Sequence, residues 1–441
     1  MVSDLSQLGF LLFVSALVAM PMQRLRMPYT VGLVLAGMGL YFLHISIKWH
    51  LSRDLIFFVF LPPLVFEAAL FIDWREFKRD LPVLSLLATV GVVLAAAVTA
   101  LGMHYALGWD WASATIFGAL IAATDPVSVI ASFKASGVKG RVRLLLEAES
   151  LLNDGTAAVA FVVTLGILAG AHQSLISIAG TLIFTIAGSI LIGGVVAAGF
   201  MFLAGRTPDY LVEITFTTLA AYGSFFLGEY LHCSGVLAAL SAGLVVGNFR
   251  SSATVIEANR QAPQSFSEYA AFIGDSLLLF LAGAKRAHYS SALSGLMTEA
   301  GRRVLVPFWE YLAFIANSLI FLLIGAQEAQ QHFENLWWPV LVAVIMVTAG
   351  RAIAIYPLCA VFSRSYLKVE RGHQHALFWG GLRGALALAL ALALPPEIPQ
   401  HDLIITLTFA VVAFSIFVQG LTIAPLLRWL GLLAPINFGG D

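Results

Sequence analysis

Residues 111–133 read WASATIFGALIAATDPVSVIASF, an apolar run whose only charged side chain is Asp125. The run has the length of a helix that crosses a bilayer. Pro126 stands in its middle, where it removes a backbone hydrogen bond and clashes with the preceding turn. Backbone groups freed in this way are tolerated at membrane depth only where they are buried or line a cavity. We therefore predict two half-helices that meet at Asp125, with an ordinary proline kink as the alternative.

The whole chain has the composition of a membrane protein. Of its 441 residues, 60% are hydrophobic and 11% are charged, whereas a soluble domain has about a quarter of its residues charged. The formal net charge is -1 and no long run of like charge occurs, which argues against a nucleic-acid partner. The two cysteines, Cys233 and Cys359, support neither a disulfide framework nor a metal site.

Apolar runs long enough to cross the hydrocarbon recur along the chain. They predict an all-α polytopic membrane protein with about 13 transmembrane helices. The predicted spans are 5–22, 28–44, 54–72, 81–107, 111–133, 143–170, 174–204, 210–231, 233–249, 308–326, 335–362, 373–394 and 402–430.

The basic residues between the spans predict the orientation. Odd-numbered loops hold 19 of the 24 lysines and arginines, and even-numbered loops hold only Lys48 and Arg53. Cytoplasmic loops carry the excess of positive charge, so the N-terminus is expected outside and the C-terminus in the cytoplasm. Residues 266–284 are similar in sequence to residues 308–326. The same charge bias places 266–284 on the cytoplasmic side, as an interfacial or partly inserted helix. This helix belongs to a non-spanning segment predicted at 254–305.

Few ionisable residues lie deep inside the predicted spans, and each is a functional candidate because charge is costly in hydrocarbon. They are Glu67, Asp125, Glu149, Asp154, Arg351 and Arg383. Glu67 lies eight residues before Arg75, Asp125 nine before Lys134, and Asp154 eleven after Arg143. At ~1.5 Å per helical residue, each acid is ~12–17 Å from the basic residue at the cytoplasmic end of its span. Three acids from three helices at the depth of the midplane predict a cation site. The alternative is that each acid is neutralised by its own basic side chain, but the spans contain too few buried bases for that.

The sixth span carries two polar faces. Ser150 and Asp154 are four residues apart and share one face, which can meet a cation together with Asp125, the Thr124 carbonyl and Glu67. Such an all-oxygen set suits a hard ion.

The neighbouring face of the sixth span carries Glu149 and Asn153. We interpret Glu149 mainly as the structural partner of Arg351 in the eleventh span, because paired buried charges compensate each other. Ligation of the cation by Glu149 is the alternative.

Three glycines lie at positions 380–384, around Arg383, and predict a second interrupted helix in the twelfth span. Arg383 is expected near carbonyl ends, where a cation is favoured. Two interrupted helices of opposite direction indicate inverted repeats, spans 4–6 and 11–13, whose broken helices cross at the ion site.

These residues belong to stretches that resemble a known family. The matching stretches are LPPLVFEAAL (61–70), ATDPVSV (123–129), EAESLLNDGTA (147–157), FIANSLIFLLIG (314–325), AGRAIAIYPL (349–358) and GGLRGALALAL (380–390). Over nearly its whole length the chain resembles NhaP-type sodium/proton antiporters of the monovalent cation:proton antiporter superfamily, which includes the animal sodium/proton exchangers.

The resemblance implies that Asp154 carries the cation and the proton, and that its pair with Asn153 marks electroneutral exchange. The further Na⁺ ligands that it implies are Asp125, Thr124, Glu67 and Ser150. It implies a structural ion pair of Glu149 and Arg351, and Arg383 as the charge at the second broken helix.

The resemblance also implies a homodimer in which a core domain moves against a dimerisation domain. The expected division is 1–80 with dimerisation helices 1–3, 81–170 with core helices 4–6, 171–330 with linker and dimerisation helices 7–10, 331–430 with core helices 11–13, and 431–441 as a short cytoplasmic tail.

We therefore expect electroneutral exchange of Na⁺ or Li⁺ for H⁺ across the cell (inner) membrane by alternating access, without a cofactor. Exchange of K⁺ for H⁺ by the same fold stays open. An intramembrane aspartyl protease is the alternative from another class, but the residues around Gly274 and Asp275 do not fit a G-x-G-D motif. A cation channel would give no reason for a titratable carrier at a broken helix.

Overall fold

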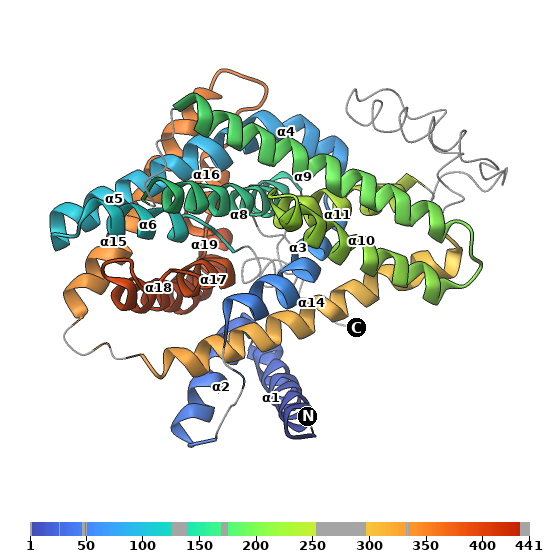
Figure 1. The fold of residues 1–441 in the computed structure, drawn as a ribbon, viewed down its shortest axis with the longest axis horizontal. Helices are drawn as coiled ribbons and strands as arrows, with labels where there is room; N and C mark the ends of the chain where they lie inside the picture. Colours follow the sequence, from blue (N-terminus) through green and yellow to red (C-terminus); the bar gives the residue numbers. More distant parts are fainter. Residues whose placement is uncertain are drawn as a thin grey trace. The chain divides into compact units, whose positions relative to one another are not determined.

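The computed structural model describes residues 2–25, 27–45, 49, 51–125, 140–168, 175–252, 297–331, 333 and 336–432. Within these ranges every regular element is a helix (Figure 1), which confirms the predicted all-α fold. The number of membrane crossings, about 13, stays a prediction. Three predicted features lie outside the described residues: the half-helix after Pro126, the helix at 266–284, and nearly all of the tail at 431–441.

The helices follow the predicted spans closely. They are α1 (Val2–Leu25), α2 (Tyr29–Phe42), η1 (Leu55–Phe60), α3 (Leu61–Leu70), α4 (Trp74–Leu86), η2 (Leu87–Gly91), α5 (Val92–Leu107), α6 (Trp111–Ile121), α8 (Arg141–Leu168), α9 (Leu175–Ala204), α10 (Tyr210–Tyr230), α11 (Gly235–Ser252), α14 (Glu299–Glu328), α15 (Trp337–Val361), α16 (Arg371–Trp379), α17 (Ala385–Leu392), α18 (His401–Phe414), η5 (Ser415–Gln419) and α19 (Gly420–Trp429), where η denotes a π-helical segment.

Two helices begin well before their predicted spans. α4 starts at Trp74, whereas its apolar run begins at 81, and α14 starts at Glu299, whereas its apolar run begins at 308. The additional turns carry charges that exclude them from an apolar run, and Arg303 pairs with Glu299 across one turn at 2.5 Å. The end of the predicted non-spanning segment is therefore the helical start of α14.

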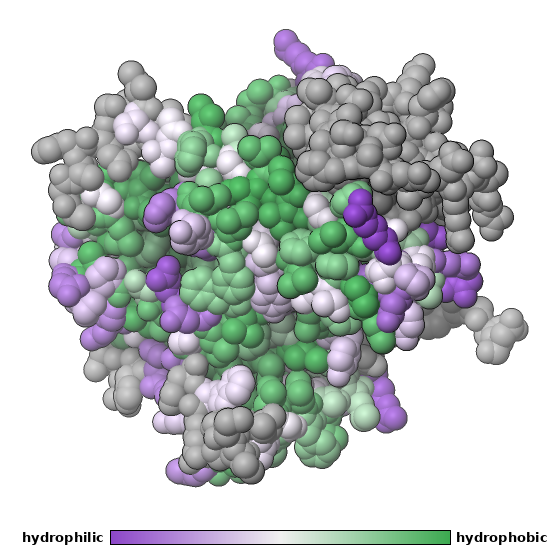
Figure 2. Space-filling view, turned by 45° about the vertical axis from the view of Figure 1, so that its right-hand side comes forward, coloured by the Kyte–Doolittle hydropathy of each residue, from purple (hydrophilic) through white to green (hydrophobic). Residues whose placement is uncertain are grey.

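Several helices have the length and composition of membrane spans. In the described part of the chain, seven helices are long and apolar enough to cross a membrane, and shorter apolar helices accompany them. Large apolar side chains are exposed on their outer faces, among them Phe13, Val93 and Ile183. Figure 2 shows apolar side chains over much of one face. An exposed apolar surface of this extent is a surface for lipid.

The chain forms two compact units. Unit 1 comprises Met1–Phe60, Glu76–Ile178 and Ile315–Asp441, and unit 2 comprises Leu61–Arg75 and Ala179–Phe314. In unit 1, α5 packs along α6 and α15, and the short helix α17 contacts α6, α8 and α18. The two short helices α6 and α17 are thus held beside α8.

Unit 2 has its own core. α3 packs against α10 and α11. The rings of Phe66 in α3 and Trp309 lie 4.4 Å apart, and the Trp309 indole donates to Thr217 Oγ1 at 3.1 Å. The indole N–H is therefore satisfied in an otherwise apolar cluster, as a buried tryptophan requires.

Candidate functional site

The first break follows α6. Asp110 caps the N-terminus of α6 by accepting hydrogen bonds from Ser113 N at 3.0 Å and Ser113 Oγ at 2.8 Å. Burial opposes ionisation of Asp110, but these hydrogen bonds outweigh it and lower the pKa of Asp110 below its ordinary value. The helix stops at Ile121, residue 122 forms a turn, and residues 123–125 have no regular secondary structure. A proline at 126 disfavours helical backbone at the residue before it.

The second break separates α16 from α17, and it crosses the first one. The backbone N–H of Asp125 donates to Leu382 O at 2.8 Å. A Cβ on Gly384 would lie 2.5 Å from the Cβ of Asp125, so only glycine allows this approach. The Asp125 carboxylate therefore lies at the N-terminal end of α17, where the helix dipole favours negative charge.

Arg383 lies at the C-terminal, carbonyl end of α6. Its Nη1 donates to Ala122 O at 3.0 Å and to Ala123 O at 3.1 Å. These carbonyls follow the last turn of α6, where a cation is favoured. Arg383 was expected at carbonyl ends, and it reaches those of the other broken helix. With only 3% of its surface exposed, its charge is held inside the crossing.

Thr124 joins the first break to α8. Its hydroxyl donates to Ser150 Oγ at 3.1 Å, and Ser150 in turn donates to the Thr124 carbonyl oxygen. Asn153 Nδ2 donates to Thr124 Oγ1 and to Ala122 O, each at 3.2 Å. The hydroxyl, amide and carbonyl groups of the predicted site thus form one hydrogen-bonded network.

Asp154 is the next residue of α8 and is buried, with 7% of its surface exposed. Its Oδ1 has no hydrogen-bond partner in the described part of the chain, and the same holds for Asn153 Oδ1. A buried carboxylate is costly unless it is paired or neutralised. A proton or a bound cation at this carboxyl group would relieve that cost.

Glu149 lies against Arg351. Arg351 Nη1 and Nη2 donate to the two Glu149 carboxylate oxygens at 2.6 and 2.8 Å, and Nη2 also donates to Leu377 O at 2.9 Å. Glu149 and Arg351 are 1% and 6% exposed. A Cβ on Gly381 would lie 2.5 Å from Arg351 Nε, so this glycine makes room for the guanidinium. The pair thereby also satisfies a carbonyl near the end of α16.

Glu67 lies in α3 of unit 2, whereas the other eight predicted site residues lie in unit 1. Its role as a ligand stays a prediction. Within the described ranges, no three His, Cys, Asp or Glu side chains are grouped as a metal site would require. The oxygens that the site brings together in unit 1 come from carboxylate, hydroxyl and carbonyl groups. A cation bound by them would be a transported ion and not a resident metal.

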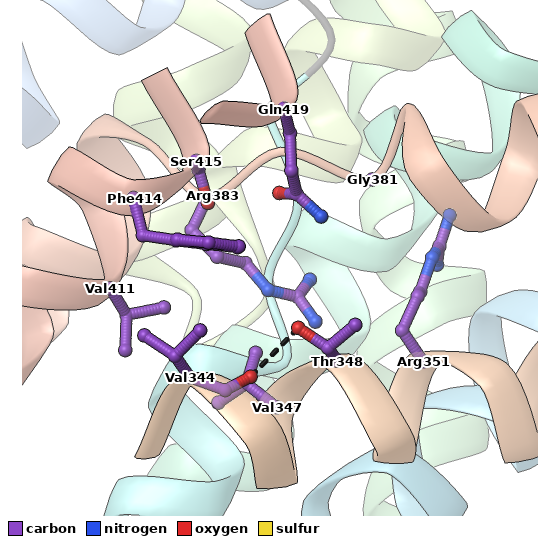
Figure 3. Close-up of a pocket in the computed structure, with 10 residues that line it drawn as sticks. All are labelled: Val344, Val347, Thr348, Arg351, Gly381, Arg383, Val411, Phe414, Ser415 and Gln419. Atoms are coloured by element: carbon purple, nitrogen blue, oxygen red, sulfur yellow. Dashed lines mark hydrogen bonds between the residues drawn. The ribbon is translucent and has the colours of Figure 1, made fainter. Parts of the chain in front are cut away.

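The sequence did not reveal the polar residues that line a cavity beside the two buried arginines. Arg351 and Arg383 share this cavity with Thr348, Ser415 and Gln419 (Figure 3). All three are uncharged, so they lack the cost of buried charge that makes ionisable residues in spans conspicuous. Polar uncharged residues four apart in the last predicted span, at 415 and 419, are a signal that could have found them.

A second missed group is a buried acid at the start of the fourth predicted span. Asp80 is fully buried and accepts from Arg141 Nη2 at 2.7 Å. Arg141 also donates to Leu367 O at 2.8 Å and Lys368 O at 2.7 Å. Asp80 stands in the charged stretch WREFKRD, which is typical of a solvated loop, so its partner could not be recognised from the sequence.

Known proteins resemble this chain over most of its length. The Na(+)/H(+) antiporter ApNhaP of Aphanothece halophytica is 37% identical to it, over 92% of this chain and 70% of its own length. The Na(+)/H(+) antiporter NhaP of Pseudomonas aeruginosa is 31% identical, over 84% of this chain and 79% of its own.

A solved structure shares the fold. The sodium proton antiporter MjNhaP1 of Methanocaldococcus jannaschii, solved at pH 8, matches with a TM-score of 0.68 and 19% sequence identity, over 98% of this chain and 97% of its own. Residues 9–429 also match the family described as sodium/hydrogen exchanger, transmembrane. As its motifs predicted, the chain therefore belongs to the sodium/hydrogen exchanger family and is of the NhaP type.

Proposed function

We propose that this protein exchanges Na⁺ or Li⁺ for H⁺ across the cell membrane, one for one, by alternating access. The observation that carries the proposal is the unpartnered Oδ1 of Asp154 in a buried site beside two crossing chain breaks. Ionisable groups in such positions mark ion and proton pathways in membrane proteins. A proton and a cation compete for this carboxylate, and the competition couples their movement.

The cation is bound by oxygens. Its ligands are Asp154, Asp125, Ser150, the Thr124 carbonyl and Glu67, a set that suits a hard monovalent ion. Support comes from the hydrogen bonds that hold Thr124, Ser150 and Asn153 together in one network. Asn153 holds the break that carries Thr124 against α8, beside the carrier.

The exchange is electroneutral because one group titrates for each cation. Asn153, next to the carrier, has no titratable proton, and Glu149 is engaged by both terminal nitrogens of Arg351. A carrier that moved two protons would need a second titrating acid at the site. Asp125 faces the N-terminal end of α17, which favours its ionised form.

The proposal extends to the assembly. Residues 81–170 and 331–430 form a core that moves against a dimerisation domain built from 1–80 and 171–330, in a homodimer. The N-terminus lies outside and the C-terminus in the cytoplasm, with 254–305 on the cytoplasmic side. The packing of α5 with α6 and α15, and of α8 with α6 and α17, supports such a core. Unit 1 also contains Met1–Phe60, which the proposal assigns to the dimerisation domain.

Proteoliposomes test the proposal. Purified protein is reconstituted with a pH-sensitive dye, a proton gradient is imposed, and Na⁺, Li⁺, K⁺ and Ca²⁺ are added in turn. Dissipation of the gradient by Na⁺ or Li⁺ is expected, and Asp154→Asn should abolish it without loss of folded protein. A response to K⁺ alone would identify a K⁺/H⁺ antiporter, and no response to any monovalent cation would refute the proposal.

A further inference from the structure

A polar cavity lies next to the crossing of the two breaks. It is bounded by α15, by the break before α17, and by α18 with its π-helical continuation η5. Figure 3 shows the Arg383 guanidinium and the Gln419 amide directed into this space. The Thr348 hydroxyl on α15 donates to Val344 O at 2.7 Å within its own helix. The cavity is thus polar on the side of Arg383 and η5.

Arg383 has further N–H donors that face the cavity. Only its Nη1 is engaged, by Ala122 O and Ala123 O. A guanidinium carries five N–H donors, and its Nε and Nη2 have no hydrogen-bond partner within the described ranges. These donors are accessible from the cavity, where water can accept from them. The described residues that line the cavity include no carboxylate, so the protein acceptors there are neutral.

Gln419 provides the neutral acceptor that faces this guanidinium. It is 6% exposed, and its side-chain amide has no hydrogen-bond partner among the described residues. It is the last residue of η5, and π-helical turns within α-helices are frequent at functional sites. No direct hydrogen bond joins Gln419 to Arg383, and a polar space between two such groups is suited to bridging water.

We propose that Gln419 is a positioning residue, which through water in this cavity holds the Arg383 guanidinium against the carbonyl end of α6. Arg383 in turn fixes the break that carries Thr124 and Asp125. This inference rests on the proposed exchange function for its consequence in transport. A neutral amide positions Arg383 without cancelling its charge, which a glutamate at the same place would do.

The charge at position 419 matters because it decides what Arg383 binds. A carboxylate there would pair directly with the guanidinium, since charge-assisted hydrogen bonds are the stronger ones. It would then compete with Ala122 O and Ala123 O for Arg383. The break that carries Thr124 and Asp125 should loosen as a result.

The test uses Gln419→Leu and Gln419→Glu in the full-length protein, with Gln400→Glu in an exposed turn as the matched control. Exchange is measured in liposomes as a function of Na⁺ concentration, and amide hydrogen exchange is measured over residues 117–125. Gln419→Glu should speed amide exchange at Asp125, because its carboxylate pairs with Arg383 and competes with the carbonyls that follow α6. Gln419→Leu should speed amide exchange at Asp125 and lower transport, each about tenfold. The control should change neither.

Variants at 419 with wild-type transport and wild-type amide exchange would overturn the inference. If Gln419→Leu fails to fold, the decision rests on Gln419→Glu, which preserves the side-chain shape. Its amide exchange over residues 117–125 then tests whether position 419 holds the break. Transport of the wild-type protein that depends on the halide present would place an anion in the cavity and also overturn it. An inactive wild type would refute the proposed exchange, while amide exchange would still decide whether Gln419 positions the break.

Discussion

Arg351→Ala should destabilise the protein strongly. The substitution removes two charge-assisted hydrogen bonds to Glu149, at 2.6 and 2.8 Å, and a third to Leu377 O. Glu149 is 1% exposed, so its carboxylate would be left buried without its cation. Breaking a buried pair by removing one partner typically costs about 3–5 kcal/mol. At a few degrees per kcal/mol, the melting temperature should fall on the order of 10 °C.

The assay is thermal unfolding of purified protein in detergent, followed by tryptophan fluorescence. Two matched variants separate the charge from the packing. Arg351→Lys keeps the charge but cannot reproduce the bidentate geometry, so it should lie between the wild type and Arg351→Ala. The double variant Glu149→Leu, Arg351→Met removes both charges, and such replacements are often neutral, so it should recover most of the loss. An unchanged melting temperature for Arg351→Ala would refute a structural role for the pair.

Four further outcomes are expected. Asp154→Asn should abolish Na⁺-driven proton movement in liposomes and keep its melting temperature, because the amide is nearly isosteric with the protonated acid; robust exchange would refute its role as the carrier. Gly384→Ala should lower both melting temperature and transport, since its Cβ would lie 2.5 Å from the Cβ of Asp125, and wild-type behaviour would contradict the crossing. Asp110→Ala should lower the free energy of unfolding by about 1 kcal/mol at neutral pH through loss of the α6 cap. Because the pKa of Asp110 is lowered by folding, its stabilisation is present above the unfolded-state pKa and should disappear as the pH falls through the folded-state value; a pH-independent difference would contradict this cause. A membrane potential set with valinomycin and K⁺ gradients should leave the initial rate of Na⁺-driven proton efflux unchanged, and a rate that follows the potential would show net charge movement.

The helices and the two breaks were predictable because their signals are local. A single Asp125 before Pro126 in an apolar run, and three glycines around Arg383, each contradict a continuous helix within a few residues of sequence. The structure has α6 ending at Ile121 and non-helical residues between α16 and α17. Burial of charge is costly wherever it occurs in hydrocarbon, so the ionisable residues were conspicuous without any partner in view.

Other parts of the site have no local signal. Asp80 stands among exposed charges of the sequence, and only the fold brings Arg141 to it from 61 residues away. Gln419 is uncharged, so the cost of its burial is too small to distinguish it from a residue that packs in a span. The first helical turns of α14 are polar, and a search for apolar runs stops before them. For Asp80 the determining contact is made between residues far apart in the chain.

The crossing of the two breaks shows why this distance matters. The carbonyl end of α6 meets Arg383 from the second break, and the N-terminal end of α17 meets Asp125 from the first. Each break thus supplies the charge that the other's helix end favours, and the Asp125 N–H to Leu382 O hydrogen bond fixes their register. Neither half-helix has its compensating charge within its own segment. The stability of the two breaks is therefore mutual, and a substitution in one should loosen the backbone of the other.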